Sequence, residues 1–304
     1  MHVVVASNHR LPVKGYGGAE RVVVALVRGL AALGHRVTLL AQPGTRVPEA
    51  ALVELPPRAL KDPRGDWRRF VPPGADVFHA HFPLARGPDA IPFVQTLHAN
   101  LKPGAPVPPN TIFLSADHAR RHGSTVFVHN GLDPDEFFFR RRKEAWDLFL
   151  GKLHSAKGYH WAVEAAKRTT RRLIVAGGWR PTFSGTIKYL GEVDGKSKAA
   201  LLARARCLWN PALWDEPFGL VSIEALFSGT PVLGTRRGAL PEIITPEVGA
   251  LGDTLEELID AASTISRRDP DACRDHAMRH FTHRAMAERY VALYRRLADT
   301  GSPG

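Results

Sequence analysis

Hydrophobic and polar positions along the chain predict strands and helices that alternate. Residues 2–6 form an apolar run of strand length, and residues 19–33 carry apolar side chains at helical spacing. Gly34 follows as the residue expected to end that helix. Further short apolar runs predict strands at 36–41, 76–80, 93–97, 111–115 and 126–128. Short apolar strands that alternate with helices are typical of a parallel sheet covered on both faces.

The same pattern starts again after a charged segment at 139–145, which we interpret as a linker. Strands are expected at 147–150, 173–176, 187–190, 208–210 and 232–233. Helices are expected at 157–168, 196–205 and 220–227, and the tail at 271–297 is also helical in pattern. Proline and glycine concentrate at 43–74 and 101–110, which predicts loops or short helices there. The sequence therefore predicts an α/β protein made of two Rossmann-like, doubly wound domains.

Composition agrees with this interpretation. A chain of 304 residues favours two domains, and the hydrophobic and charged fractions of 44% and 23% are ordinary for a globular protein. Cys207 and Cys273 lack metal-binding spacing, which favours neither a zinc site nor a disulfide, and fits a reducing compartment. We see no signal-peptide pattern and no apolar run of about 18 residues, so we expect a cytoplasmic protein.

The formal net charge of +11 allows three interpretations. The first is a solvated, arginine-rich surface. The second is attraction to anionic substrates, or a weak peripheral contact with an anionic membrane. The third, nucleic-acid binding, is disfavoured because no nucleic-acid-binding module is recognisable near the basic run at 140–143.

Two turns between a predicted strand and a predicted helix carry groups suited to phosphate. Gly17 and Gly18 precede the first helix, where a glycine backbone and a helix N-terminus could approach an anion, although such glycines often only make a tight turn. Lys152 and Lys157 flank the corresponding turn of the second half. Two lysines there could neutralise a diphosphate, or they could be ordinary surface residues.

The segment 216–224 is the most specific one in the chain. Pro217 precedes the predicted helix, and a proline is tolerated there because its missing N–H would be unpaired anyway. Glu224 lies inside that helix, where a carboxylate is a good acceptor for paired hydroxyls such as those of a ribose. Glu216 lies before the helix, where it could reach a sugar.

These segments together resemble glycosyltransferase family 4, the retaining transferases of the GT-B fold. The resemblance runs from the first strand to about residue 250. It is carried by residues 17–21 (GGAER), 76–81 (DVFHAH), 96–98 (TLH), 129–133 (HNGLD), 151–158 (GKLHSAKG), 216–224 (EPFGLVSIE) and 229–232 (GTPV).

The resemblance implies two Rossmann-like domains that face each other across a cleft, and a C-terminal helix that returns to the first domain. Residues 1–143 would form the acceptor-side domain, and residues 144–279 the domain that binds a nucleotide sugar. Residues 280–304 would form a helix that crosses back to the first domain. The chain is shorter than many family members, mainly at 43–75. That region usually shapes the acceptor side, so the resemblance does not define the size of the acceptor.

The resemblance also implies a role for each site residue. Glu216 and His98 would act on the donor sugar, with Gly17 and Gly18 near the donor phosphate. Lys152 and Lys157 would hold the diphosphate and stabilise it as it leaves. The remaining donor-binding residues would be Phe218, Gly219, Leu220 and Glu224, the first three through backbone N–H groups and the last through ribose hydroxyls.

The family usually has arginine where this chain has Lys152. Lysine cannot form the bidentate hydrogen bonds of arginine, so the affinity for the donor is expected to be weaker.

Other candidate sites have simpler explanations. Asp133-Pro134-Asp135 spells a D-x-D metal motif of a different transferase fold, but it follows a predicted turn. His79 and His81 could chelate a metal from alternate strand positions, yet no third ligand is evident. His98 could be a packed histidine, and Trp209 and Trp214 are better explained by packing than by sugar stacking. We therefore expect no metal and no cofactor apart from the nucleotide sugar.

The expected activity is transfer of a sugar from a nucleoside diphosphate, such as UDP or GDP, to an acceptor hydroxyl with retention at the anomeric carbon. The acceptor could be a small molecule, a glycan or a lipid-linked molecule. The alternatives are a nucleotide-sugar epimerase, a phosphorylase of the same fold, or a protein that binds a nucleotide sugar without transferring it. A phosphorylase would need a pyridoxal-phosphate lysine context that we do not find.

Overall fold

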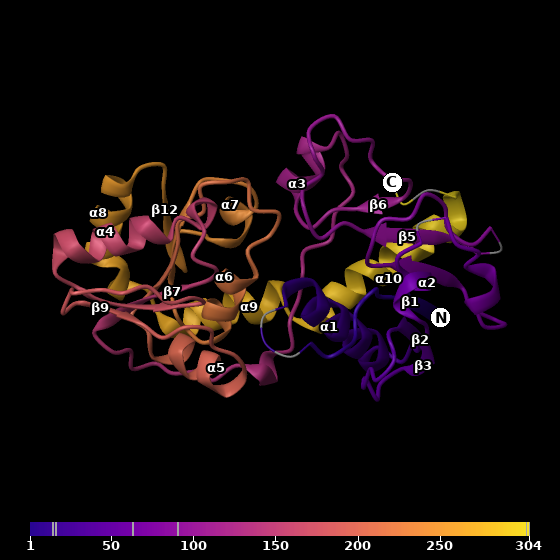
Figure 1. Ribbon diagram of the computed structural model, residues 1–304, viewed down its shortest axis with the longest axis horizontal. Helices are drawn as coiled ribbons and strands as arrows, with labels where there is room; N and C mark the ends of the chain where they lie inside the picture. The colour runs from indigo at the N-terminus through magenta and orange to yellow at the C-terminus, as the bar shows by residue number, and fades with distance from the viewer. Residues whose placement is uncertain (14, 16, 63, 90, 302, 304) are drawn as a thin grey trace. The chain divides into compact units, whose positions relative to one another are not determined.

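The computed structural model describes residues 1–13, 15, 17–62, 64–89, 91–301 and 303 (Figure 1). Its contacts divide the chain into two units, one comprising Met1–Leu132 with Thr282–Gly304 and the other Asp133–Phe281. Each unit is built on a six-stranded sheet whose strands are all parallel, so the prediction of two Rossmann-like domains is confirmed. Parts of the predicted loops and tail at residues 16, 63, 302 and 304 lie outside the described residues.

Unit 1 has the strand order β3-β2-β1-β4-β5-β6. Its strands are β1 (His2–Ala6), β2 (Arg36–Ala41), β3 (Ala51–Glu54), β4 (Val77–Ala80), β5 (Phe93–Thr96) and β6 (Thr111–Ile112). Its helices are α1 (Gly18–Ala32), α2 (Pro57–Leu60), α3 (Ala116–Arg121) and α10 (His283–Thr300), with a 3₁₀ turn at Arg68–Phe70. Gly34 has the left-handed φ of +79° expected of a residue that follows a helix.

Two predictions for unit 1 need correction. Strand β3 lies within the stretch predicted as loop, and it is a mostly exposed strand at the sheet edge, so it lacks the apolar run that marks the central strands. The strand expected at 126–128 is reduced to a single bridge between Phe113 and Phe127. This segment lies at the edge of the sheet, so it has a neighbouring strand on one side only and its pairing does not extend beyond the bridge.

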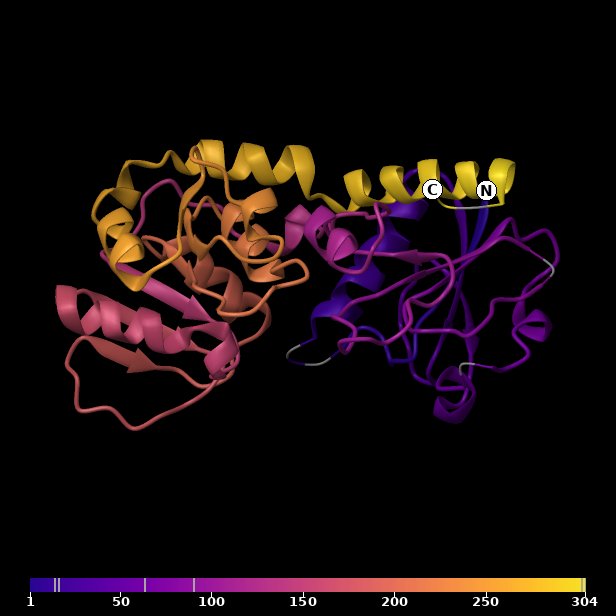
Figure 2. The ribbon, with the colours of Figure 1, turned by 90° about the horizontal axis from the view of Figure 1, so that it is seen from above.

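The last helix, α10, packs on α1 within unit 1 (Figures 1 and 2). The two helices come close at Gly29 of α1, where a side chain would collide with the backbone carbonyl of His283 and the methyl group of Ala287. The N–H of His283 donates to the carbonyl of Leu132 at 2.8 Å, which joins the start of α10 to the end of the first segment of unit 1.

Unit 2 has the strand order β12-β11-β10-β7-β8-β9. Its strands are β7 (Trp146–Leu150), β8 (Arg172–Ala176), β9 (Ile187–Tyr189), β10 (Leu208–Asn210), β11 (Val232–Thr235) and β12 (Gly249–Gly252). Its helices are α4 (Tyr159–Thr169), α5 (Gly195–Arg204), α6 (Leu220–Phe227), α7 (Leu240–Ile243), α8 (Leu255–Thr264) and α9 (Pro270–His280). Three 3₁₀ turns lie at Pro134–Glu136, Ser155–Lys157 and Ile265–Arg267.

The tail predicted as helix at 271–297 is two helices. Helix α9 ends before Phe281, and the side chain of Thr282 accepts a hydrogen bond from the N–H of Ala285 to begin α10. A threonine cap satisfies one of the unpaired N–H groups at a helix start, which favours a new helix at this point. The break coincides with the boundary between the two units.

The charged segment 139–145, interpreted as a linker from the sequence, lies within unit 2 and packs against other parts of it. The ammonium of Lys143 donates to the carbonyls of Ala203 and Ser228 and to the hydroxyl of Thr230 at 2.8–2.9 Å. Burial lowers the pKa of Lys143 to about 7. Just before this segment, Phe137 stacks on Phe227 of α6 with ring centroids 5.3 Å apart.

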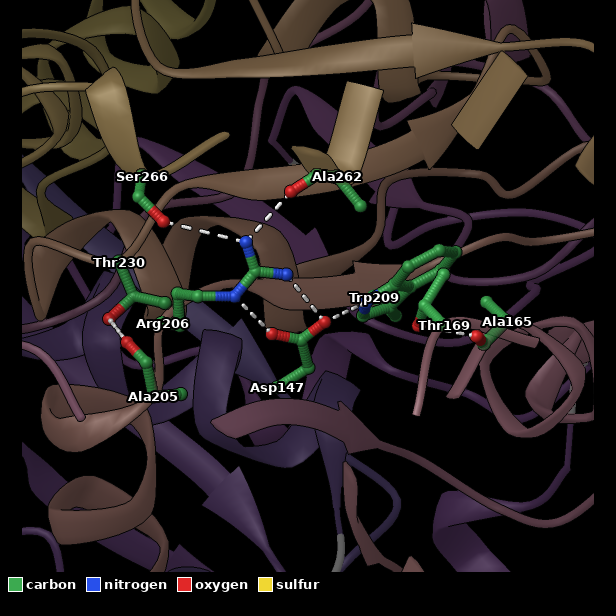
Figure 3. Close-up of polar contacts among 9 residues, drawn as sticks. All are labelled: Asp147, Ala165, Thr169, Ala205, Arg206, Trp209, Thr230, Ala262 and Ser266. Carbon is green, nitrogen blue, oxygen red and sulfur yellow. Dashed lines mark hydrogen bonds and ion pairs between the residues drawn. The ribbon is translucent and has the colours of Figure 1, made fainter. Parts of the chain in front are cut away.

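A buried ion pair ties β7 to the strand beside it (Figure 3). Arg206 donates through Nε and Nη2 to the two carboxylate oxygens of Asp147 at 2.6 and 2.8 Å. Its Nη1 reaches the carbonyl of Ala262 at 2.7 Å, and the indole N–H of Trp209 donates to Asp147 at 3.0 Å. The Asp147 carboxylate therefore has three donors in a region where an unpaired charge would be costly.

We expect Arg206→Met to destabilise unit 2 by about 3–5 kcal/mol, because it leaves the Asp147 carboxylate buried without its main partner. Replacing both residues, as in Asp147→Leu with Arg206→Met, should recover most of the loss. Urea denaturation of the three proteins measures both effects. A loss below about 1 kcal/mol in the single variant would show that the pair is not needed.

Candidate active site

The strand order of unit 2 places two loops side by side. The chain moves outward from β7 through β8 to β9, and then returns to the other side of β7 to form β10. Leu148 and Phe149 of β7 pair with Leu208 and Trp209 of β10. Because parallel strands end at the same edge, the loops after β7 and β10 meet at the point where the strand order reverses. Ligands of such sheets bind at this point.

Backbone contacts hold these two loops together. The N–H of Leu213, in the loop after β10, donates to the carbonyl of Ala156 at 2.8 Å. Gly158 has φ of +68° and lies so close to the carbonyl of Pro211 that a side chain would not fit. The residues next to these contacts, Lys157 and Trp214, are therefore brought to the same place from opposite loops.

Lys157 and Glu216 form an ion pair at this edge. The Lys157 ammonium lies 2.5 Å from Oε2 of Glu216, with side-chain exposures of 28% and 12%. The indole N–H of Trp214 donates to the same carboxylate oxygen at 3.0 Å. The Lys157 ammonium also lies 4.8 Å from the centre of the Trp214 ring, a cation–π distance. Two of the predicted catalytic residues are thus in direct contact.

Lys152 lies in the same turn as Lys157, at an exposed position directly after Gly151. The 3₁₀ turn Ser155–Lys157 follows it and ends at Gly158, so α4 begins at Tyr159 and not at residue 157 as predicted. Lys157 therefore belongs to the turn that precedes the helix. This places both predicted lysines before the N-terminus of α4.

Helix α6 begins at the same edge as this ion pair. Phe218 is buried, Gly219 adopts a left-handed φ of +89°, and Leu220 is the first helical residue. The N-cap residue of α6 is Gly219, which has no side chain that could cap the helix. The start of a helix carries a partial positive charge from its N–H groups, so the predicted residues Phe218, Gly219 and Leu220 lie where an anion is favoured.

Glu224, the carboxylate predicted for ribose, lies one turn further into α6 and is buried with 2% of its side chain exposed. The ammonium of Lys198, on α5, lies 3.0 Å from its Oε1 atom. Sequence reasoning did not single out Lys198. The pair depends on how α5 and α6 pack, which no spacing within the chain reveals.

His98 of unit 1 is paired with a second histidine. Its Nε2 atom lies 2.9 Å from Nδ1 of His81, and the two rings stack with centroids 5.2 Å apart. Burial, with a smaller contribution from His9, lowers the pKa of His98 to about 4. His98 is therefore a neutral imidazole near pH 7, able to donate or accept a hydrogen bond without carrying charge.

His79 joins the sheet of unit 1 to α10. Its Nδ1 atom lies 2.6 Å from the hydroxyl of Tyr294, and its Nε2 atom lies 2.8 Å from the hydroxyl of Thr96. The Thr96 hydroxyl also lies 2.9 Å from that of Tyr290. Both ring nitrogens of His79 are thus engaged with hydroxyls, which leaves neither for the metal site considered from the sequence.

Gly17 and Gly18 lie at the start of α1, where Gly17 has extended backbone and Gly18 is the first helical residue. A side chain on Gly17 would collide with Val13 and with the carboxylate of Glu20. Glu20 lies in the first turn of α1, with His9 3.6 Å away. The two glycines therefore lie at a helix N-terminus as predicted, while their proposed contact with phosphate stays a prediction.

The D-x-D segment serves a local turn. The Asp133 carboxylate accepts a hydrogen bond from the N–H of Asp135 at 3.1 Å and so caps the 3₁₀ turn Pro134–Glu136. Within the described ranges, no group of three or more His, Cys, Asp or Glu side chains is arranged to hold a metal ion. Of the helices in those same ranges, none combines the length and apolarity that crossing a bilayer requires.

The two parallel sheets, with the groups that gather at the β7 and β10 loops, define a protein of the GT-B glycosyltransferase fold. Residues 16–136 match the family described as Glycosyltransferase Family 4, and residues 147–268 match the family described as Glycosyl transferases group 1. The chain belongs to glycosyltransferase family 4.

Two solved structures share the fold of this chain. The chain is 30% identical to AviGT4, a glycosyltransferase involved in avilamycin A biosynthesis, with a TM-score of 0.81 and 98% of each chain covered. HepE of Anabaena, solved with UDP-glucose, shares the fold at 14% identity, a TM-score of 0.66 and 98% and 100% coverage.

A sequence relative, the uncharacterized glycosyltransferase MJ1607 of Methanocaldococcus jannaschii, is 29% identical over 154 residues, which are 41% of this chain and 39% of MJ1607. The chain spans less than half the length of the first curated relatives that it matches.

The buried histidines predict how stability depends on pH. Burial lowers the pKa of His79 to about 3, against 6.5 in the unfolded chain. Between these values the unfolded state holds a proton that the folded state lacks. The stability that comes from the neutral ring is therefore fully present above pH 6.5 and is lost as the pH falls toward 3.

We expect His79→Gln to reduce the slope of unfolding free energy against pH near pH 5 by about 1.4 kcal/mol per pH unit, the effect of one proton. Urea denaturation at a series of pH values between 4.5 and 6.5 measures this slope. An unchanged slope would mean that His79 is protonated in the folded protein.

Proposed function

We propose that this protein transfers a sugar from a nucleoside diphosphate sugar to an acceptor hydroxyl, with retention at the anomeric carbon. The observation that carries the proposal is the cluster at the β7 and β10 edge of unit 2. There a lysine, a carboxylate and a helix N-terminus lie together. Membership of glycosyltransferase family 4 supports the same reaction class.

In this proposal the diphosphate binds to Lys152, Lys157 and the start of α6. A lysine ammonium is a compact positive charge that can pair with a phosphate oxygen. The backbone N–H groups near Gly219 lie at the N-terminus of α6, whose partial positive charge also favours a phosphate. As the bond to the sugar breaks, negative charge grows on the diphosphate. Groups that are already in place stabilise this charge without having to reorganise.

Carboxylates hold the two ends of the donor. Glu216 accepts hydrogen bonds from hydroxyls of the sugar, and Glu224 accepts them from the ribose, with Lys198 fixing its position. We assign His98 to the donor sugar as a neutral hydrogen-bonding group, consistent with its lowered pKa. Gly17 and Gly18 would offer the N-terminus of α1 to the donor phosphate.

The chemical step exchanges one carbon–oxygen bond for another. The bond between the anomeric carbon and the diphosphate oxygen breaks, and the acceptor oxygen bonds to the same face of that carbon. The acceptor proton passes to the departing diphosphate, so the leaving group acts as the base that deprotonates the acceptor hydroxyl. We propose that no metal and no organic cofactor takes part.

The test begins with thermal stability in the presence of UDP-, GDP-, ADP- and TDP-sugars. A donor at about 100 times its dissociation constant should stabilise the protein by about 2.7 kcal/mol. With that donor, Lys157→Ala and Glu216→Gln should each lower turnover by about 10² to 10³, because each removes a group that stabilises or orients the transition state.

Lys167→Ala is the matched control, since Lys167 is an exposed lysine on α4. Lys167→Ala should leave turnover unchanged. Adding EDTA to the assay should also leave turnover unchanged, because the proposed reaction uses no metal. Wild-type turnover in both site variants would refute the proposed site. Conversion of the nucleotide sugar without any acceptor would indicate an epimerase, and binding without turnover would indicate a binding protein.

A further inference from the structure

Lys157 has two roles in the proposed function, on which this inference rests, and one ammonium group has to serve both. In the structure it pairs with Oε2 of Glu216. In the proposed reaction it faces the diphosphate. If the pair were the only interaction that held Glu216, the carboxylate would lose its position when the donor binds.

Trp214 supplies a second donor to the same carboxylate. Its indole N–H lies 3.0 Å from Oε2 of Glu216, two residues further along the loop. The loop itself is fixed next to Trp214, because the N–H of Leu213 donates to the carbonyl of Ala156 on the facing turn. The indole therefore belongs to a backbone position that donor binding need not change.

The same ring also contacts the lysine. The Lys157 ammonium lies 4.8 Å from the ring centre of Trp214, within the range of a cation–π interaction. One indole thus touches Glu216 through its N–H edge and Lys157 through its face. Packing alone, the explanation favoured from the sequence, does not require either contact.

Both donors meet at one oxygen of the carboxylate. Throughout the described ranges of the chain, no hydrogen bond reaches the other oxygen, Oε1 of Glu216. The Glu216 side chain keeps 12% of its surface exposed. A carboxylate can accept several hydrogen bonds, so Oε1 is suited to accept one from a hydroxyl of the sugar.

We propose that Trp214 is the positioning residue of this site. It holds Oε2 of Glu216 through its N–H, so that Oε1 stays directed toward the sugar when Lys157 turns to the diphosphate. Its ring face guides Lys157 between the two positions. Trp214 acts through Glu216 and Lys157, and it need not touch the substrate.

Trp209 provides a matched control. Its indole N–H also donates to a carboxylate, that of Asp147, at 3.0 Å, but Trp209 is buried in the core of unit 2. Trp209→Phe and Trp214→Phe therefore remove the same kind of hydrogen bond at two different places. Only the second is expected to affect catalysis.

The experiment measures kcat with the donor found above, and the dissociation constant of the matching free nucleoside diphosphate, for both variants. Trp214→Phe should lower kcat by about 10- to 100-fold, the loss expected for a hydrogen bond to a charged group. Its affinity for the free nucleotide should change by no more than about threefold, because the free nucleoside diphosphate lacks the transferred sugar that Glu216 is proposed to contact. Trp209→Phe should leave kcat within about twofold and lower the unfolding midpoint.

A second comparison uses Glu216→Gln with and without Trp214→Phe. If Trp214 acts through Glu216, adding Trp214→Phe to Glu216→Gln should have almost no further effect on kcat. Three results would overturn the proposal: wild-type kcat in Trp214→Phe while Glu216→Gln is impaired, a further tenfold loss in the double variant, or a loss of free-nucleotide affinity above tenfold. Wild-type activity of both Glu216→Gln and Lys157→Ala would instead refute the proposed site on which this inference rests.

Discussion

The partly buried pair between Lys157 and Glu216 is the interaction on which this account of the site depends. Taking two opposite charges out of water costs free energy that their attraction only partly offsets, so such a pair is weak evidence of stabilisation by itself. Here the pair lies where the strand order of unit 2 reverses, on two loops joined by backbone contacts. A pair in that position is better explained by binding than by folding. We propose that it holds a cation and a carboxylate in place for a ligand that interacts with both.

The ion pair of Arg206 and Asp147 illustrates the difference. It is almost fully buried, makes two short hydrogen bonds and is surrounded by other donors and acceptors (Figure 3). Because both side chains are almost fully buried, they offer a ligand almost no accessible surface. Lys157 and Glu216 retain exposed surface, and within the part of the chain that the structure describes only one carboxylate oxygen of Glu216 accepts hydrogen bonds. The two pairs occur in the same unit, yet the first fixes the sheet, and we propose that the second exchanges partners when a ligand binds.

Strands and helices could be predicted correctly where a run of apolar residues is sufficient to define them. Strands β1, β2 and β10 and helix α6 have the predicted bounds, because each is buried along most of its length. Strand β12, which has only Ala250 and Leu251 between two glycines, and helix α8, which carries several acidic residues, were not predicted. The break in the tail at Thr282 was missed because a cap competes locally with a helical pattern that continues past it.

The candidate site was predictable in type but not in arrangement. Family resemblance gave Lys157, Glu216 and Glu224, and strand order explains why the first two meet. Lys198 and Trp214 could not be identified in these roles. The contact of Lys198 arises from packing between α5 and α6, and Trp214 meets Lys157 only because the loops after β7 and β10 lie together. The pairing of His98 with His81 likewise needs two neighbouring strands in register.

The most direct test of the central claim is a crystal structure with a non-transferable nucleoside diphosphate sugar. The account predicts that the Lys157 ammonium leaves Glu216 for a phosphate oxygen, while Glu216 receives a sugar hydroxyl at Oε1 and keeps the Trp214 indole on Oε2. A diphosphate bound away from the β7–α4 turn, or a Lys157 that stays on Glu216 with the donor in place, would contradict it.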